Sequence, residues 1–350
     1  MAVITYKCPN CDGGLEFDPG TQTFRCAWCG SAFTKEELDR QQPAAQSETA
    51  ANAAPDEAEE GQPLLYSCPS CGAQIVTDDT TAATFCYYCH NPVVLTGRLE
   101  GAFRPDKVLP FAIQREEAVE RFLAWVKKKR FVPEDFFSEQ QIQRLTGVYY
   151  PYWMVDSERY AEAEGTGTKV RIWTTGDTRY TETSYFQVVR GGRAVFRDLA
   201  KSALKKADRD LAELVQPFDS SRMQDFSMGY LSGFQAEKRD MERSDFQQDV
   251  DRELDRYTTD LLRRSAGEYA TLSLSAPRYG EGGQHWYYAL LPVWTLTYRG
   301  NNGKTYYYLM NGQTGEVWGM LPVSWKKLAA LFLSVAGALF ALLCAGGYYL

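Results

Sequence analysis

The stretches Cys8-Pro-Asn-Cys11 and Cys26-Ala-Trp-Cys29 are followed, 60 residues further on, by Cys68-Pro-Ser-Cys71 and Cys86-Tyr-Tyr-Cys89. Each copy has the spacing Cys-x2-Cys-x14-Cys-x2-Cys, so the chain contains an internal repeat. A Cys-x-x-Cys turn can place two sulfurs on one ion, and two such turns complete the tetrahedral shell that Zn²⁺ prefers. The spacing therefore predicts two small zinc ribbons, at residues 1–40 and 64–104.

We expect every clustered cysteine to be a ligand of one of two structural zinc ions. These ligands are Cys8, Cys11, Cys26, Cys29, Cys68, Cys71, Cys86 and Cys89. Four thiolates close the coordination shell and leave no position for a catalytic water. Gly30 and Gly72 follow two of the turns and allow the backbone to fold tightly, while Asp12 and His90 hold the equivalent places in the other two. We interpret His90 as a turn residue and not as a fifth ligand.

The position of the cysteines also bears on the compartment. A secreted disulfide framework would need a signal peptide, and residues 1–7 contain no apolar run. Clustering of eight of the nine cysteines indicates metal binding in a reducing compartment instead. Cys-Pro-x-Cys resembles redox motifs, although those usually occur once, at a helix start. A zinc-thiolate redox sensor is therefore an alternative hypothesis.

The charge distribution argues against nucleic acid as the partner. The 350-residue chain has a net charge of −7, and residues 1–40 and 64–104 each contain more acids than bases. Each zinc ion with four thiolates adds a further negative charge, which favours recognition of a protein over contact with phosphate. The alternative is a membrane-tethered nucleic-acid binder that uses Trp28, Tyr87, Tyr88 and the basic run at residues 127–130. That run also suits a helix C-terminus or contact with anionic lipid.

Nothing in the sequence predicts an enzyme. Only two histidines occur, His90 and His285, and the chain has no phosphate-binding loop, nucleophile elbow or His-Glu-x-x-His motif. We therefore expect no catalytic residue, no small-molecule substrate and no cofactor other than zinc.

The rest of the chain divides by composition. Residues 41–63 are rich in Ala, Gln and Glu with no base, which predicts a flexible acidic linker. Residues 105–323 have the composition of an α+β domain with antiparallel meander sheets and helices. Helices are predicted at residues 115–130, after Ser138, at 198–215 and over 223–265 with interruptions; strands are predicted at 148–160, 167–174, 179–189, 269–275, 286–298, 305–310 and 316–321. The fragments Tyr150-Pro-Tyr-Trp153 and Leu291-Pro-Val-Trp294 are compatible with a diverged duplication.

The C-terminus predicts a membrane anchor. Residues 328–350 contain no charge, and their 23 residues would reach about 34 Å as a helix, enough for the apolar core of a bilayer. Lys326 and Lys327 precede this segment and should remain on the cytoplasmic side, while Tyr348 and Tyr349 suit the far interface. Residues 324–350 are thus expected to be a single-pass tail anchor, with everything before them in the cytoplasm.

Paired ribbons, the Leu-Pro-Val-Trp fragment, the turn Met310-Asn-Gly-Gln-Thr-Gly315 and a terminal apolar helix together resemble tail-anchored double zinc-ribbon membrane proteins of Gram-positive bacteria, a group described by a TFIIB-type zinc ribbon. The resemblance implies a non-enzymatic adaptor that works with SPFH-domain or phage-shock-like membrane-stress proteins. It also implies that the eight ribbon cysteines are ligands. A helicase function, sometimes attached to such proteins, finds no motor motif in this sequence.

Overall fold

The computed structural model describes residues 3–4, 6–41, 64–68, 70–86, 89–205, 213–300 and 302–348. The predicted linker, apart from Gln41, lies outside these residues, as do Tyr87, Tyr88 and Tyr349. Internal contacts divide the chain into two compact units. The first unit contains Met1–Pro151, Leu204–Asp240 and Ala289–Leu350, and the second contains Tyr152–Ala203 and Met241–Tyr288. The predicted central domain, residues 105–323, thus contributes to both units, and both cysteine repeats belong to the first.

The first cysteine repeat forms its own small sheet. Strands β2 (Leu15–Asp18), β3 (Thr23–Cys26) and β4 (Ala32–Phe33) pair antiparallel, and α1 (Lys35–Gln41) follows them. Alternation along β2 and β3 directs Leu15, Phe17 and Phe24 inward, where all three are buried. The result is a minimal core beside the four cysteines.

The second cysteine repeat is divided between two sheets. Strands β5 (Leu64–Ser67) and β6 (Gln74–Thr77) form a separate hairpin. Strands β7 (Thr81–Phe85) and β8 (Pro92–Leu95) instead join a twelve-stranded sheet, because β7 pairs with β13 (Gln235–Glu237) and β8 pairs with β1 (Val3–Ile4). Half of this repeat is therefore built into the twelve-stranded sheet, which is the main sheet of the protein.

The remaining core of the first unit is aromatic. Helix α2 (Arg115–Lys127) confirms the helix predicted at 115–130 and buries Phe122 against Tyr308 of β16 (Thr305–Asn311). Phe111 stacks on Phe234 in the same core. Beside it, β9 (Lys107–Val108) pairs with β15 (Arg278–Arg299), and β17 (Val317–Gly319) pairs with β16. Ser138 accepts a hydrogen bond from the Gln141 N–H and begins α3 (Glu139–Ile142), as its sequence predicted.

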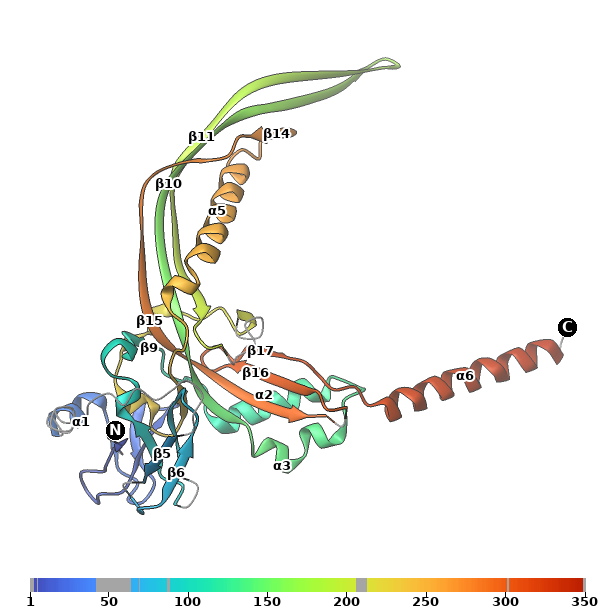
Figure 1. Ribbon diagram of the computed structural model, residues 1–350. Coiled ribbons are helices and arrows are strands. Elements are labelled where there is room, and N and C mark those ends of the chain that lie inside the picture. Colours follow the sequence, from blue (N-terminus) through green and yellow to red (C-terminus); the bar gives the residue numbers. More distant parts are fainter. Residues whose placement is uncertain are drawn as a thin grey trace. The chain divides into compact units, whose positions relative to one another are not determined.

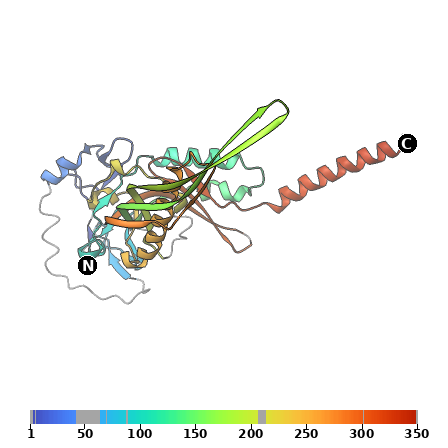
Figure 2. The same ribbon diagram turned by 90° about the horizontal axis from the view of Figure 1, so that it is seen from above.

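The second unit is organised around one long hairpin. Strands β10 (Thr146–Thr175) and β11 (Thr178–Ser202) pair from Tyr152↔Ser202 to Thr175↔Thr178, and they continue past β14 (Thr271–Leu274) as a two-stranded ribbon, green in Figures 1 and 2. Helix α5 (Gln247–Arg264) packs Val250 and Leu254 against Val155.

Two predictions about secondary structure were wrong in this hairpin. The strands expected at 148–160 and 167–174 are one strand, because β14 lies so close to Gly165 that a Cβ there would overlap Ser273 O. Gly165 therefore allows a close backbone approach and does not end the strand. The helix expected from residue 198 is strand as far as Ser202, and residues 206–212 are outside the described part.

Of the helix predicted over residues 223–265, the structure confirms only the part that forms α5. The preceding residues form β12 (Gln224–Asp225), β13 and short 3₁₀ turns. Gly233 has a φ of 92°, and Tyr230, Leu231 and Phe234 are all buried. A surface helix is buried on one face, whereas this segment is buried on several sides. Tertiary packing therefore decided its conformation against local helix propensity.

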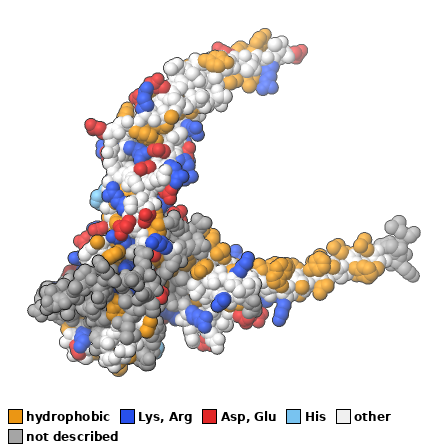
Figure 3. Space-filling view, in the orientation of Figure 1, with side chains coloured by type: hydrophobic (Ala, Val, Ile, Leu, Met, Phe, Trp, Pro, Cys, Tyr) orange, Lys and Arg blue, Asp and Glu red, His pale blue; other side chains and the backbone are white. Residues whose placement is uncertain are grey.

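The chain's described part ends in an apolar helix, α6 (Trp325–Tyr348). Its segment Trp325–Cys344 has a mean hydropathy of 2.2, and none of it is buried by the rest of the protein, as Figures 1 and 3 show. Among the described residues, α6 is the helix that is long and apolar enough to cross a membrane. Two four-cysteine groups, a sheet-rich body with helices and this C-terminal helix make up the fold.

Candidate metal centres

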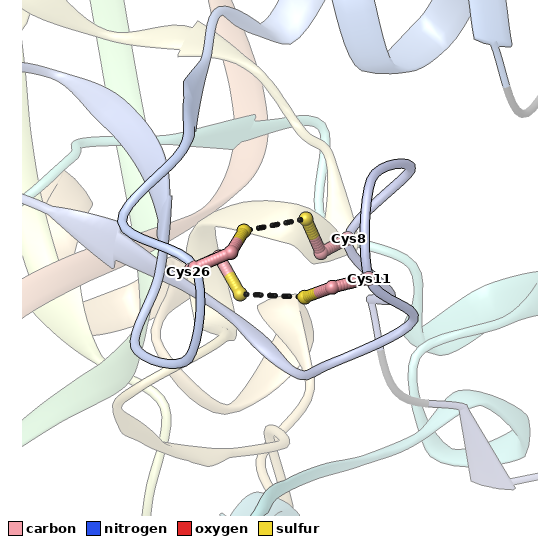
Figure 4. Close-up of side chains that lie close together, drawn as sticks. Cys8, Cys11 and Cys26 are labelled. Atoms are coloured by element: carbon pink, nitrogen blue, oxygen red, sulfur yellow. Dashed lines mark hydrogen bonds between the residues drawn. The ribbon is translucent and has the colours of Figure 1, made fainter.

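The first cysteine group is assembled at one end of the small sheet, where Leu15, the first residue of β2, pairs with Cys26, the last residue of β3. Cys8 and Cys11 precede β2, whereas Cys26 ends β3 and Cys29 follows it. Their sulfurs all lie within 4.8 Å of one another, with Cys8 Sγ 3.6 Å from Cys29 Sγ and Cys11 Sγ 3.5 Å from Cys26 Sγ. Figure 4 shows the sulfurs of Cys8, Cys11 and Cys26 turned toward one another from facing loops.

The second group repeats this arrangement. Cys68 Sγ is 3.7 Å from Cys89 Sγ, and Cys71 Sγ is 3.7 Å from Cys86 Sγ. A disulfide would bring two sulfurs to about 2 Å, so these are free thiols. Four sulfurs at about 2.3 Å from a central zinc ion would be about 3.8 Å apart at the edges of the tetrahedron. Both groups therefore fit a four-coordinate metal ion, and the all-sulfur donor set is consistent with zinc.

All four Cys-x-x-Cys turns share one backbone pattern. The N–H of the first cysteine donates to the carbonyl five residues later: Cys8 to Gly13 at 2.7 Å, Cys26 to Ser31 at 2.9 Å, Cys68 to Ala73 at 2.7 Å and Cys86 to Asn91 at 3.0 Å. The second cysteine of each turn accepts a hydrogen bond from a backbone N–H two residues later, as Gly13 donates to Cys11 and Asn91 to Cys89. Amide donors of this kind orient sulfur ligands and stabilise their negative charge.

The residue after each second cysteine adopts a left-handed backbone conformation. Gly30 and Gly72 have φ values of 74° and 75°, and Asp12 and His90 have values of 60° and 57°. A side chain with a Cβ is strained in this region, which explains glycine at two of the four positions. His90 is therefore at a turn position, as its sequence context predicted.

Two substitutions test the left-handed positions after Cys71 and Cys89 in the second group. His90→Gly should raise the free energy of unfolding of the metal-loaded protein by up to about 1 kcal/mol, because glycine accepts the left-handed conformation without strain. Gly72→Ala should lower it by about 1–2 kcal/mol, and this loss reflects backbone strain alone because the space around its Cβ is open.

Denaturant unfolding measures both changes, and elemental analysis gives the metal content. Both variants should keep the metal content of the unchanged protein. Loss of metal from the His90→Gly variant would show instead that His90 is a ligand.

Two thiols of the first group, Cys29 and Cys11, have pKa values shifted in opposite directions. The Ser31 hydroxyl lies 3.2 Å from Cys29 Sγ, and its hydrogen bond, together with that of the Ser31 backbone, lowers the pKa of Cys29 to about 6. The Gly13 N–H acts to lower the pKa of Cys11, but hydrogen bonds with Cys29 and Cys26 outweigh it and raise this pKa to about 12. Neighbouring sulfurs share protons because several thiolates cannot lie together uncompensated. A divalent cation would remove this restriction.

A docking contact of the first repeat was not foreseen from the sequence. The Phe17 N–H donates to Ser232 O at 2.9 Å, and the Phe17 ring meets the Tyr230 ring edge-on at 5.2 Å between centroids. The Ser232 hydroxyl also donates to Leu15 O. The apolar run at residues 228–234 is the only signal of this contact in the sequence, and its pattern predicts part of a helix. The first repeat is therefore packed on Tyr230 and Ser232 of the same unit.

The sequence offers two candidate sets of binding residues, the aromatic residues between cysteines and the basic run at residues 127–130. Trp28, between the cysteines of a turn, is 76% exposed. Residues 127–130 are exposed at the end of α2. The structure does not describe the aromatic residues between Cys86 and Cys89.

These features define a protein with two candidate tetrathiolate metal centres in a sheet-rich body and a C-terminal helix able to span a membrane. The chain is 31% identical to the uncharacterized protein YdjG of Bacillus subtilis (strain 168) over 338 residues, covering 97% of this chain and 96% of the relative. The chain therefore belongs to the YdjG family. No protein-family model and no solved structure matches it.

Proposed function

We propose that this protein is a non-enzymatic adaptor, fixed in the membrane by α6, that recruits a cytosolic protein to the inner face of the membrane. Two structural zinc ions, held by the two cysteine groups, maintain the recruiting surface. The observation that carries this proposal is that each metal centre is closed. All four coordination positions are cysteine sulfurs, so a bound zinc ion has no open position for water or substrate.

The first metal centre also provides a surface for a partner. Trp28 projects from the Cys26–Cys29 turn with 76% of its surface exposed, and large aromatic side chains supply much of the binding energy in protein interfaces. Hydrogen bonds from Phe17 and Ser232 hold the repeat to the rest of the first unit, so this surface is preorganised. A rigid surface loses less conformational entropy on binding than a mobile module does.

The partner we propose is an SPFH-domain oligomer or another membrane-stress protein. The resemblance to tail-anchored double zinc-ribbon proteins supports this class, and so does the acidic character of both repeats, which disfavours phosphate ligands. An oligomer would present many copies of a binding site to many membrane-anchored copies of this chain, so weak single contacts would suffice.

Recovery of partners from membranes tests this proposal. The full-length protein is purified in mild detergent with and without nuclease, and the co-purifying proteins are quantified by mass spectrometry. Trp28→Ala should reduce recovery of the main partner at least about tenfold, which is the usual effect of removing an aromatic hot spot. Deletion of residues 1–100 is unsuitable as a control, because β1, β7 and β8 belong to the main sheet. Val76→Ala, a second exposed apolar position in the repeats, is the matched control and should retain the partner.

Two other outcomes identify the alternative functions. Recovery that collapses with nuclease would indicate a membrane-tethered nucleic-acid binder, whose retention should also fall steeply with salt. Release of zinc by peroxide at physiological doses, accompanied by loss of partner, would indicate a zinc-thiolate redox sensor. Equal recovery with the Trp28→Ala variant and the unchanged protein would contradict the proposed recruiting surface.

A further inference from the structure

A basic run lies beside the start of the apolar helix, although the two are far apart in the sequence. Residues 127–130, Lys-Lys-Lys-Arg, are exposed at the C-terminal end of α2. The next residue, Phe131, accepts a hydrogen bond through its carbonyl from the Ser324 N–H at 2.7 Å. Because Ser324 directly precedes α6, this contact brings the basic run to the place where the apolar helix begins.

A second contact holds the same two segments together. Lys327 Nζ, in the first turn of α6, donates to Val132 O at 3.0 Å and lies 3.5 Å from Glu134 Oε1. The charge of Lys327 is therefore partly compensated locally. Lys326 is exposed and, among the described residues, forms no ion pair with an acid. Two hydrogen bonds and an ion pair thus fix the first turn of α6 beside residues 131–134.

The surface around this junction is basic in an otherwise acidic protein. Residues 125–137 and 320–327 together contain six bases and two acids, Glu134 and Asp135, whereas the whole chain has a net charge of −7. Figure 3 shows Lys and Arg side chains on the body close to the base of the apolar helix. Compensation of the α2 dipole does not explain the whole run, because α2 ends at Lys127 and the effect is limited to the last turn.

Aromatic side chains accompany these bases. Trp325, the first residue of α6, is 76% exposed, and Lys129 Nζ lies 6.0 Å from the centroid of the Trp125 ring. Tryptophan together with Lys and Arg is the composition of membrane–water interfaces, where the ring lies among headgroups and the charge faces phosphate. This composition fits a lipid surface better than a protein interface, whose centre is poor in lysine.

We propose that residues 127–130 and Lys326 form a binding surface for the headgroups of anionic phospholipids, on the side of the membrane from which α6 enters. The inference rests on the membrane anchoring in the proposed function but not on the adaptor role. Each base close to an anionic membrane surface increases binding about fivefold, so the run at 127–130 should dominate lipid preference. The consequence is that the body is held against the membrane by a second, charge-dependent contact.

The test measures which lipids the full-length protein selects. The protein is reconstituted in vesicles of phosphatidylcholine and phosphatidylglycerol in equal amounts, and the relative association of spin-labelled forms of the two lipids is measured by electron paramagnetic resonance. The test variant carries Lys127→Gln, Lys128→Gln, Lys129→Gln and Arg130→Gln. The control variant carries Lys169→Gln, Arg171→Gln, Arg179→Gln and Arg193→Gln, four exposed bases of the second unit, and has the same net charge.

We expect the unchanged protein and the control variant to prefer phosphatidylglycerol at least about tenfold, and the test variant to lose most of this preference. The preference should also weaken as salt is added, because exposed charges are screened. A test variant that keeps the preference, or a control variant that loses it equally, would overturn the proposal.

Flotation of the same vesicles distinguishes failure of the membrane anchor from failure of the lipid-binding surface. Failure of the unchanged protein to float would overturn the anchor and this surface together, whereas absence of a protein partner leaves the lipid result unaffected.

Discussion

Replacing both Cys68 and Cys71 with serine is expected to remove one of the two proposed zinc ions and to unfold more than the second repeat. Cys68 and Cys86 are buried in one cluster with Ile75 and Val93, so loss of the ion opens this cluster. Structural zinc contributes about 10–16 kcal/mol in zinc-finger peptides, which equals or exceeds the whole stability of a typical domain. Strands β7 and β8, and through them β1 and β13, should lose their protection.

Hydrogen–deuterium exchange and elemental analysis measure this result. Amides of residues 3–4, 81–86, 89–95 and 235–237 should exchange at least about a thousandfold faster, which corresponds to about 4 kcal/mol. The comparison is Cys8→Ser with Cys11→Ser, which should also remove one ion. Its faster exchange should be confined to residues 6–41 and the contact at 228–234, because β2, β3 and β4 form a separate sheet.

Cys344→Ser is the control for loss of a thiol as such, because this cysteine lies in α6 outside both groups. It should keep both ions and an unchanged exchange pattern. If the Cys68→Ser, Cys71→Ser variant left β7 and β8 fully protected, the second metal centre would not stabilise the main sheet.

The second large effect concerns α6. We expect Val335→Asp with Leu339→Asp to release the protein from membranes, because each carboxylate at the centre of a spanning helix costs about 3 kcal/mol. Both residues lie in the middle of Trp325–Cys344, a segment that nothing else in the described chain covers. Together the two carboxylates would make membrane insertion of α6 less favourable by about 6 kcal/mol. Each leucine at the centre of the helix favours insertion by only about 0.5 kcal/mol, so the remaining leucines could not compensate.

Flotation and carbonate extraction measure membrane insertion, and Val335→Leu with Leu339→Val is the apolar control. The control and the unchanged protein should stay with the membrane, whereas the double aspartate variant should appear in the soluble fraction. Digestion of oriented vesicles by protease then tests the proposed cytoplasmic side. An unchanged protein that is soluble without detergent would show that α6 is covered by a partner and does not span the bilayer.

Several features could be predicted from the sequence because they depend on interactions between residues that are close together in the chain. Spacing alone identified the two four-cysteine groups, since a Cys-x-x-Cys turn has few geometries and the structure brings each group within 4.8 Å. The positions of Asp12 and His90 in left-handed turns followed from their equivalence to Gly30 and Gly72. Helix α2 and the N-terminal cap at Ser138 were also predicted, because an apolar stripe and a capping hydroxyl act over a few residues.

Features that depend on contacts between distant segments were missed. Gly165 reads as a break in a strand, but it permits the close approach of β14, more than 100 residues away. Residues 228–234 read as helix, but their apolar side chains are buried on several sides, partly under the first repeat. Propensity differs among ordinary residues by well under 1 kcal/mol, whereas burial of one large side chain is worth about 2 kcal/mol, so packing decides such segments.

By itself, the sequence determined the ligand spacing, the turns around the sulfurs and the apolar length of α6, because each depends on covalent geometry or on residues close together in the chain. Tertiary structure alone decided that β7 and β8 enter the main sheet and that the first repeat packs on Tyr230 and Ser232. It also placed residues 127–130 beside the start of α6, through the hydrogen bond from Ser324 to Phe131. Such pairings depend on which distant surfaces complement one another, and no local pattern specifies the partner of a strand edge or of an exposed apolar side chain.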